Sequence, residues 1–185
     1  GALYLRSGVW GGAENLSASI KNSTFDGNLV KGSGALGGAL YAKSDYDSEK
    51  DKHYILNLDL DNVTFKNNIS ESWGGAMFVQ GEGSLTMKDV TFEGNQGVYG
   101  SALAVYGNKP YESSLEKVNT VEVTATNVHY LNNVSKGKEA GAALYLYTKT
   151  RYNQTGGSFV GNKTTGSSNL LGAVFVKGAD AVFTD

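Results

Sequence analysis

Two aspartates in the middle of the chain have the spacing that glycoside hydrolysis requires. Asp59 and Asp61 flank Leu60 in an alternating apolar and polar run. An extended backbone would place both carboxyl groups on one face, about 6.6–6.8 Å apart. Inverting glycosidases hold their two carboxyl groups about 6.5–9.5 Å apart, and one of them needs a raised pKa. The pair keeps a carbohydrate-processing enzyme, a polysaccharide lyase or glycosidase, as an alternative function.

Acidic residues at alternate positions also occur in the run 45–51, as they do in a calcium-binding loop. They are Asp45, Asp47, Glu49 and Asp51. Lys50, however, stands where such a loop needs glycine for its sharp turn, and no glutamate follows at the twelfth position. We interpret the run as a solvated loop insertion.

The remaining reactive residue types are sparse. The chain has no cysteine, which excludes disulfides and thiolate metal sites, and its two histidines, His53 and His129, are far apart in sequence. The two arginines, Arg6 and Arg151, are likewise far apart in sequence. No set of serine, histidine and aspartate can be drawn from the sequence, and no phosphate-binding loop is present. The sequence therefore predicts a protein that is not an enzyme and that holds no metal or cofactor.

The composition limits the classes of partner that the chain can bind. The 185 residues include 16 Lys and Arg against 18 Asp and Glu, a net charge of −2 without the basic footprint that nucleic acid requires. No run of about 18 apolar residues predicts a membrane-spanning helix. Glycine is abundant, with 25 residues, whereas there is one proline. A chain of this composition is expected to form many turns.

Two short motifs alternate along the chain and indicate the elements that position these side chains. The first is an aromatic residue followed three positions later by asparagine: Phe25 and Asn28, Phe65 and Asn68, Phe92 and Asn95, Tyr130 and Asn133, Phe159 and Asn162. The second is a small-small-Ala-aliphatic run: 37–40, 74–77, 100–103, 141–144 and 171–174, with Gly1-Ala2-Leu3 as a further copy. The ending 182–185 is interpreted as the start of a sixth aromatic motif. Constant motifs separated by variable gaps are typical of a solenoid with loops of different lengths.

Aligned on the aromatic residue, the copies predict the backbone conformation and the stacking. Two residues after the aromatic only glycine or asparagine occurs, which predicts a corner with positive φ: Gly27, Asn67, Gly94, Asn132 and Gly161. The asparagines that follow are expected to form a hydrogen-bonded ladder between windings about 4.8 Å apart. Three residues before the aromatic, a polar residue or glycine predicts a bend: Asn22, Asn62, Asp89, Asn127, Gly156 and Asp180.

Alternation with period two predicts strands before each aromatic and after each small-small-Ala run. The second strand carries aliphatic residues on its inner face and a row of rings on its outer face: Tyr4, Tyr41, Phe78, Tyr145 and Phe175. A row of exposed rings could contact glycans or another chain, so we take it as the candidate binding face. The insertions 43–54 and 107–119 are further candidates, because loops on a rigid scaffold often carry recognition.

These patterns predict an all-β fold, a right-handed parallel β-helix of about five to six coils with loop insertions. The hand follows from the preference of parallel crossovers. An antiparallel sandwich would also show short alternating strands, but it would not produce matched columns. We expect residues 1–185 to form one β-helix segment of a longer repeat array. The unpaired strand edges at its two ends predict end-to-end or lateral self-association.

The alternating tetrapeptides resemble the repeats of the chlamydial polymorphic outer-membrane proteins and of similar autotransporter passengers. Four of the five aromatic motifs match fully and Tyr130 substitutes at the fourth, whereas Gly-Gly-Ala is intact at residues 37–39 and 74–76 and varied later. The chain departs from the family in having no cysteine. The resemblance implies a secreted, surface-displayed adhesin segment without enzymatic activity, anchored at the outer membrane if bacterial. It also implies a protein or glycan ligand on a cell surface. A purely structural spacer remains the other alternative.

Overall fold

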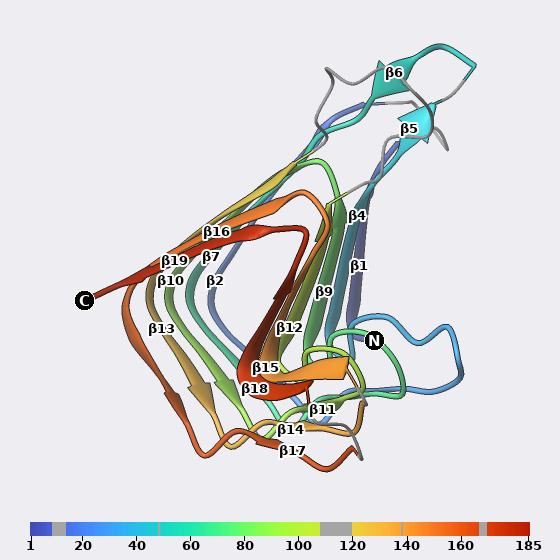
Figure 1. Cartoon of the computed structure of the whole chain (residues 1–185). Coiled ribbons are helices and arrows are strands. Elements are labelled where there is room, and N and C mark those ends of the chain that lie inside the picture. Colours follow the sequence, from blue (N-terminus) through green and yellow to red (C-terminus); the bar gives the residue numbers. More distant parts are fainter. Residues whose placement is uncertain (9–13, 48, 108–119, 138, 167–169) are drawn as a thin grey trace.

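The structure is a computed structural model and describes residues 1–8, 14–47, 49–107, 120–137, 139–166 and 170–185. Its backbone winds through three parallel sheets that enclose a triangular core (Figure 1). The first sheet has the order β1 (Leu3–Ser7), β4 (Leu40–Ser44), β9 (Met77–Gly81), β12 (Leu103–Gly107), β15 (Glu139–Tyr147) and β18 (Leu170–Lys177). The prediction of a parallel β-helix is confirmed.

The second and third sheets complete each coil. The second has the order β19 (Asp180–Thr184), β16 (Thr150–Val160), β13 (Val121–Leu131), β10 (Gly83–Glu93), β7 (Leu56–Lys66) and β2 (Leu16–Asp26). The third contains β17 (Lys163–Thr164), β14 (Val134–Ser135), β11 (Gln96–Gly97), β8 (Ile69–Ser70) and β3 (Leu29–Val30). A separate antiparallel hairpin, β5 (Tyr46–Asp47) with β6 (Lys52–His53), projects from one corner (Figure 1).

Strand register places equivalent motif residues over one another. Phe65 pairs with Phe25 in the preceding coil and with Phe92 in the following one. Tyr130 continues the column, pairing with Phe92 and then with Phe159. The insertions between motifs leave the ladder as loops, so gaps of different length do not disturb the register.

The second sheet turns a corner in mid-strand. At the predicted bend, positive φ angles of 49° to 66° occur in five successive coils: Asn22, Asn62, Asp89, Asn127 and Gly156. Each bend therefore lies inside one long strand and does not separate two short ones. Asparagine, aspartate and glycine tolerate this conformation, which explains why the column contains no other residue type.

The sequence pattern predicted the wrong register for the last partial copy, residues 180–185. Phe183 pairs with Gln154, not with Phe159, and Asp180 pairs with Arg151, not with the bend residue Gly156. The ending 182–185 is therefore not a sixth aromatic motif. It repeats the part of the coil that precedes the bend, because the short link after β18 lets β19 pair with the first half of β16.

The core consists of stacked aliphatic and aromatic side chains from the inner faces of the sheets. Leu60, Met77 and Leu103 are among the fully buried residues, and the Phe25–Phe159 rings complete the packing. Near the C-terminal coils the core becomes partly polar: Tyr130 Oη lies 2.9 Å from Tyr152 Oη, which donates to Gln154 Oε1 at 2.7 Å. Burial raises the pKa of Tyr130 well above its usual value. These buried polar atoms satisfy one another, as buried groups must. Within the described residues, no helix is long and apolar enough to cross a membrane.

Candidate functional site

The asparagine column forms a continuous amide ladder inside the coil. The backbone N–H and the Nδ2 of Asn68 both donate to Asn95 Oδ1, at 2.9 and 3.0 Å, and Nδ2 also donates to the carbonyl of Phe25 at 2.9 Å. The same pattern links Asn28 to Asn68, Asn95 to Asn133, and Asn133 to Asn162. Asn68, Asn95 and Asn133 are fully buried. The ladder thus satisfies backbone and side chain together, and its three middle amides are closed to a ligand.

The turn column before the ladder has the conformation that its residue types suggest. Its φ angles lie between 52° and 68°: Gly27, Asn67, Gly94, Asn132 and Gly161. Parallel rings stack just before the corner, with centroids 5.0, 5.0, 5.2 and 4.6 Å apart from Phe25 to Phe159. These residues hold the coil together and leave the outer faces as the candidate surfaces for binding.

The predicted row of exposed rings lies on the outer face of the first sheet, but its middle is not exposed. Tyr4 is 52% exposed, whereas Phe78 and Tyr145 are only 4% and 3% exposed. The equivalent residue between them in register is Ala104. The expectation of an open ladder formed by all five rings is therefore wrong.

Trp73 is the reason that the middle of the row is covered. It precedes the Gly74-Gly75-Ala76 turn, and its ring packs 5.7 Å from Phe78 and 5.2 Å, at 90°, from Tyr145. The small side chain of Ala104 leaves a gap in the row that a large ring beside it can cover. Tyr99, which pairs with Trp73 in a parallel bridge, stacks on it at 4.6 Å.

A second outer row adds two tyrosines that the sequence reasoning missed. Tyr106 and Tyr147 follow the first row by two residues, lie on the same face, and stack with centroids 5.0 Å apart. We call the whole set the aromatic outer face: Tyr4, Tyr41, Trp73, Phe78, Tyr99, Tyr106, Tyr145, Tyr147 and Phe175. The period-two spacing would have revealed Tyr106 and Tyr147, and the position before each glycine turn would have revealed Trp73 and Tyr99.

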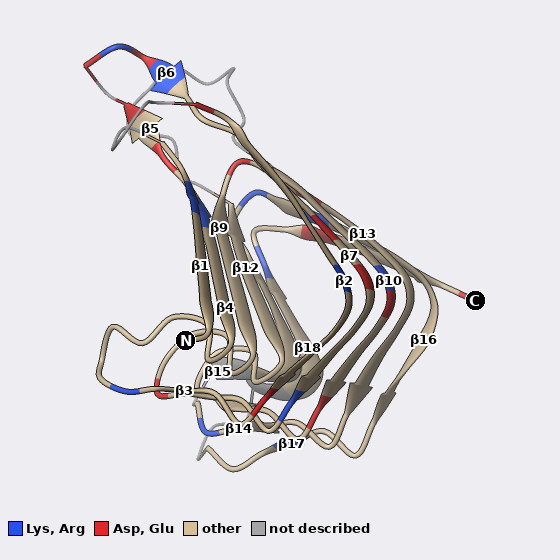
Figure 2. Ribbon diagram, turned by 180° about the vertical axis from the view of Figure 1, so that it is seen from behind, with Lys and Arg blue, Asp and Glu red and all other residues tan. Residues whose placement is uncertain are grey.

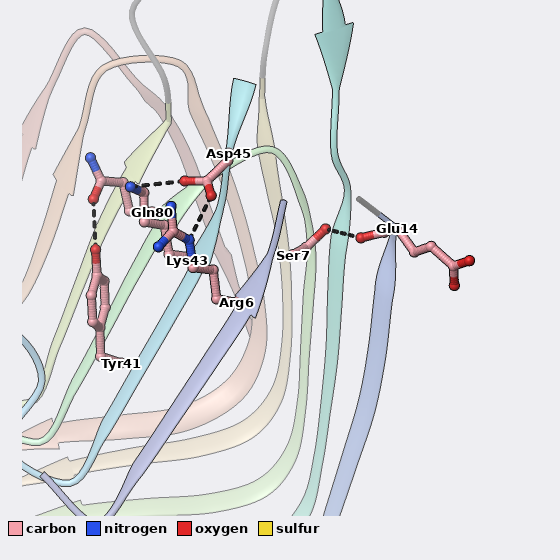
Figure 3. A network of polar contacts seen from close by, with 7 residues as sticks. All are labelled: Arg6, Ser7, Glu14, Tyr41, Lys43, Asp45 and Gln80. Atoms are coloured by element: carbon pink, nitrogen blue, oxygen red, sulfur yellow. Dashed lines mark hydrogen bonds and ion pairs between the residues drawn. The ribbon is translucent and has the colours of Figure 1, made fainter. Parts of the chain in front are cut away.

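Polar side chains lie at one margin of this face (Figure 3). Tyr41 Oη donates to Gln80 Oε1 at 3.2 Å, and burial raises the pKa of Tyr41 to about 12. Asp45 accepts from Arg6 Nε at 2.6 Å and pairs with Lys43 Nζ at 2.9 Å (Figure 3). Burial alone would raise the pKa of Asp45, but hydrogen bonds from Lys43 and Arg6 outweigh it and lower that pKa. At the other end, Lys177 Nζ lies 5.8 Å from the Tyr147 ring.

The acidic run 45–51 does not have the arrangement of a calcium loop. Asp45 is occupied by the two cations, and Asp47 Oδ1 accepts the backbone N–H groups of Glu49 and Lys50 at 3.0 and 3.3 Å. Among the described residues, no group of three or more His, Asp or Glu side chains could hold a metal ion. The hairpin is instead attached to the next coil through His53, whose Nδ1 lies 3.1 Å from Glu82 Oε2. Residues 108–119 of the second insertion lie outside the described part of the chain.

The carboxyl pair of the second sheet is part of a surface charge pattern. Asp61 pairs in register with Lys21 and Lys88, and Figure 2 shows opposite charges alternating across β2, β7 and β10 near the bend. Asp59 lines a shallow hollow of about 380 Å³ whose other lining residues, apart from Leu58, are small or polar, and Asp61 does not line it. Of the two carboxylates, Asp59 alone borders this hollow.

The fold defines a parallel β-helical repeat protein. Within it, residues 62–76 match the family model of the Chlamydia polymorphic membrane protein repeat. This stretch runs from the bend residue Asn62 through Phe65 and Asn68 to Gly74-Gly75-Ala76, so it contains both motifs. No curated protein and no solved structure matches the chain. One stretch of this parallel β-solenoid is thus similar to a polymorphic membrane protein repeat.

Proposed function

We propose that this chain is a segment of a cell-surface adhesin that binds a protein partner through the aromatic outer face. The family to which the matched repeat belongs typically provides autotransporter passengers and adhesins at the outer membrane. The observation that carries the proposal is the gathering of nine aromatic side chains on one outer face of a rigid solenoid. Seven of these rings are exposed or half-buried, and large apolar patches at the surface of soluble proteins usually mark contact sites.

The residue types favour a protein interface. Tyrosine, tryptophan and arginine are enriched at the centres of interfaces, where they supply most of the binding energy. Here five tyrosines and Trp73 lie partly buried or exposed on the face, with Arg6 and Lys43 at the margin. Partial burial by neighbouring rings pre-orders these side chains, which lowers the entropy lost on binding.

The ring geometry favours a protein over a stacked sugar. Tyr4, Tyr41 and Phe78 stack on one another with centroids 5.0 and 5.5 Å apart and interplanar angles of 20°. The ring faces between them are therefore covered, so apart from the outer face of Tyr4 the stack presents ring edges outward. A sugar platform needs an open ring face, whereas a protein surface can pack against edges and hydrogen-bond to hydroxyls.

Binding of the purified chain to host cells tests this proposal. The variant Tyr106→Ser/Tyr147→Ser should bind at least about 10-fold more weakly, because interface hot spots each contribute more than about 1 kcal/mol. Thr86→Ala/Thr124→Ala, on the outer face of the second sheet, serves as the matched control. Protease treatment of the cells should abolish binding, while removal of glycans should not.

Two outcomes would support the alternatives. If both double variants bind cells as well as the unmodified chain, this segment acts as a spacer. In that case deletion of two whole coils would shorten the rod and leave adhesion of the full protein intact. Turnover of a polysaccharide that is lost in Asp59→Asn and Asp61→Asn would instead favour the carbohydrate-processing enzyme.

A further inference from the structure

A serine, a histidine and an asparagine lie in hydrogen-bond contact on the outer face of β13 and β16. Ser158 Oγ is 2.9 Å from His129 Nδ1, and His129 Nε2 is 3.0 Å from Asn127 Oδ1. The register of β13 and β16 places His129 directly opposite Ser158. The sequence suggested no such set, because Ser158 and His129 are 29 residues apart and only coil stacking brings them together.

Asp89 determines where the protons of this group lie. Asn127 Nδ2 is 2.6 Å from Asp89 Oδ1, and an ionised carboxylate can only accept, so the amide nitrogen faces Asp89. The amide oxygen of Asn127 then faces His129, and Nε2 must be the protonated ring nitrogen. Nδ1 consequently carries the lone pair, and the hydroxyl of Ser158 donates to it.

The backbone before Ser158 holds this geometry in place. Gly156 and Gly157 have φ angles of 66° and 89°, which other residues rarely adopt. A side chain at Gly157 would also collide with the carbonyl oxygen of Val128. The next residue, Phe159, stacks on Tyr130 at 4.6 Å, and this fixes Ser158 toward the outside. Both Ser158 and His129 are only half-buried, so a substrate can reach them from solvent.

We infer that Ser158 is a nucleophile that accepts acyl groups from activated esters or thioesters, with His129 as its general base and Asn127 as the residue that orients the imidazole. The arrangement contains a nucleophile, a base within hydrogen-bond reach and a third group that fixes the tautomer, which is the logic of serine and cysteine hydrolases. It goes beyond the adhesive role and departs from the non-catalytic expectation.

The reaction balances with the residues present and water. Ser158 Oγ attacks the carbonyl carbon while its proton passes to His129 Nδ1, and the bond from that carbon to the leaving oxygen or sulfur breaks. The leaving phenolate or thiolate departs with the electron pair, and the imidazolium then gives up its proton. Water, deprotonated by His129, attacks the acyl ester, releases the carboxylic acid and restores the Ser158 hydroxyl. We limit the substrates to activated leaving groups, since these depart without protonation.

Labelling of the intact chain tests the site. The protein is incubated with p-nitrophenyl acetate, or with a fluorophosphonate probe, and the modified peptide is identified by mass spectrometry. We expect one adduct on Ser158, no adduct there in Ser158→Ala, and labelling at least about 100-fold slower in His129→Gln, the usual loss of a general base. Ser84→Ala, which removes a serine whose hydroxyl donates to Asn57 Oδ1, should label at the unmodified rate.

The orienting residue provides a second readout. Asn127→Gly, which tolerates the positive φ of the bend but removes the acceptor for Nε2–H, should slow labelling. Asn127→Asp in an Asp89→Asn background keeps that acceptor without placing two carboxylates together, and it should retain most of the rate. Circular dichroism of each variant checks that the fold is kept. Labelling of Ser158 no faster than that of other serines, or an equal rate in folded His129→Gln, would overturn the inference.

Discussion

The β-helix contains two stacks of aromatic rings, one inside the coil and one outside, and they differ in regularity. The inner stack, from Phe25 to Phe159, is unbroken, with interplanar angles of 5° to 9°. The outer row tilts by 11° to 20° and is interrupted at Ala104, where Trp73 covers the gap. The middle inner rings, Phe65, Phe92 and Tyr130, are fully buried between the core and the amide ladder, so each coil must place an aromatic ring there. Outer rings are supported from one side and can vary, which suits a recognition surface.

A substitution in the buried asparagine ladder should have the largest effect on stability. Asn95→Ala removes the acceptor of two hydrogen bonds from Asn68 and the donor to Phe65 and Asn133. Each buried group left unsatisfied costs about 1–3 kcal/mol, so we expect a loss of about 3–6 kcal/mol in the free energy of unfolding. Urea denaturation measures it. Asn28→Ala, at the half-buried end of the ladder, is the control and should cost about 1 kcal/mol.

Truncating one ring from each stack compares the two directly. Phe92→Ala empties a fully buried position and should destabilise the protein by about 3–5 kcal/mol. Phe78→Ala should cost less, about 1–3 kcal/mol, because Trp73 and the neighbouring side chains on this face can relax into the space. Thermal and urea denaturation of both variants provide the measurement, and equal losses would contradict the distinction between the stacks.

Filling the gap at Ala104 in the outer row should displace Trp73, which covers it. Ala104→Tyr would continue the row between Phe78 and Tyr145 and compete with Trp73 for the same space. We expect a stability change of about 1–3 kcal/mol, as for other overpacked sites. The emission of Trp73 should shift to longer wavelength, measured in a Trp10→Phe background. An unshifted spectrum would mean that Ala104 does not make room for Trp73.

The smallest expected effect concerns the polar margin of the outer face. The pKa of Asp45 is lowered in the folded state, so the unfolded state binds the proton more readily. The stability that this carboxylate contributes is present above its unfolded pKa, near 4, and is lost as the pH falls through the folded value. Asp45→Asn should therefore flatten the acid limb of the stability curve by up to about 1 kcal/mol. Denaturation between pH 2 and about 6 tests this, and an unchanged limb would contradict it.

End-to-end self-association stays a prediction. Sedimentation of the purified chain tests it, because a clean monomer with exchange-protected terminal coils would refute it. In the acidic run 45–51, Asp45 is engaged by Arg6 and Lys43, and Asp47 by backbone N–H groups.

The sequence alone determined the corners and the stacked columns of the coil. The two positive-φ columns of the motifs contain only glycine, asparagine or aspartate, and buried amides and rings stack on amides and rings in the next coil. Columns such as Asn28 to Asn162 therefore appear directly in the alternating motifs. The tertiary structure decided what lies outside the coil. Whether Trp73 covers Ala104, and whether Ser158 meets His129, depends on contacts between residues far apart in the chain. The outer rings do leave a period-two pattern, but their packing is less constrained than that of the core, so which residues cover them becomes known only when the coils are stacked.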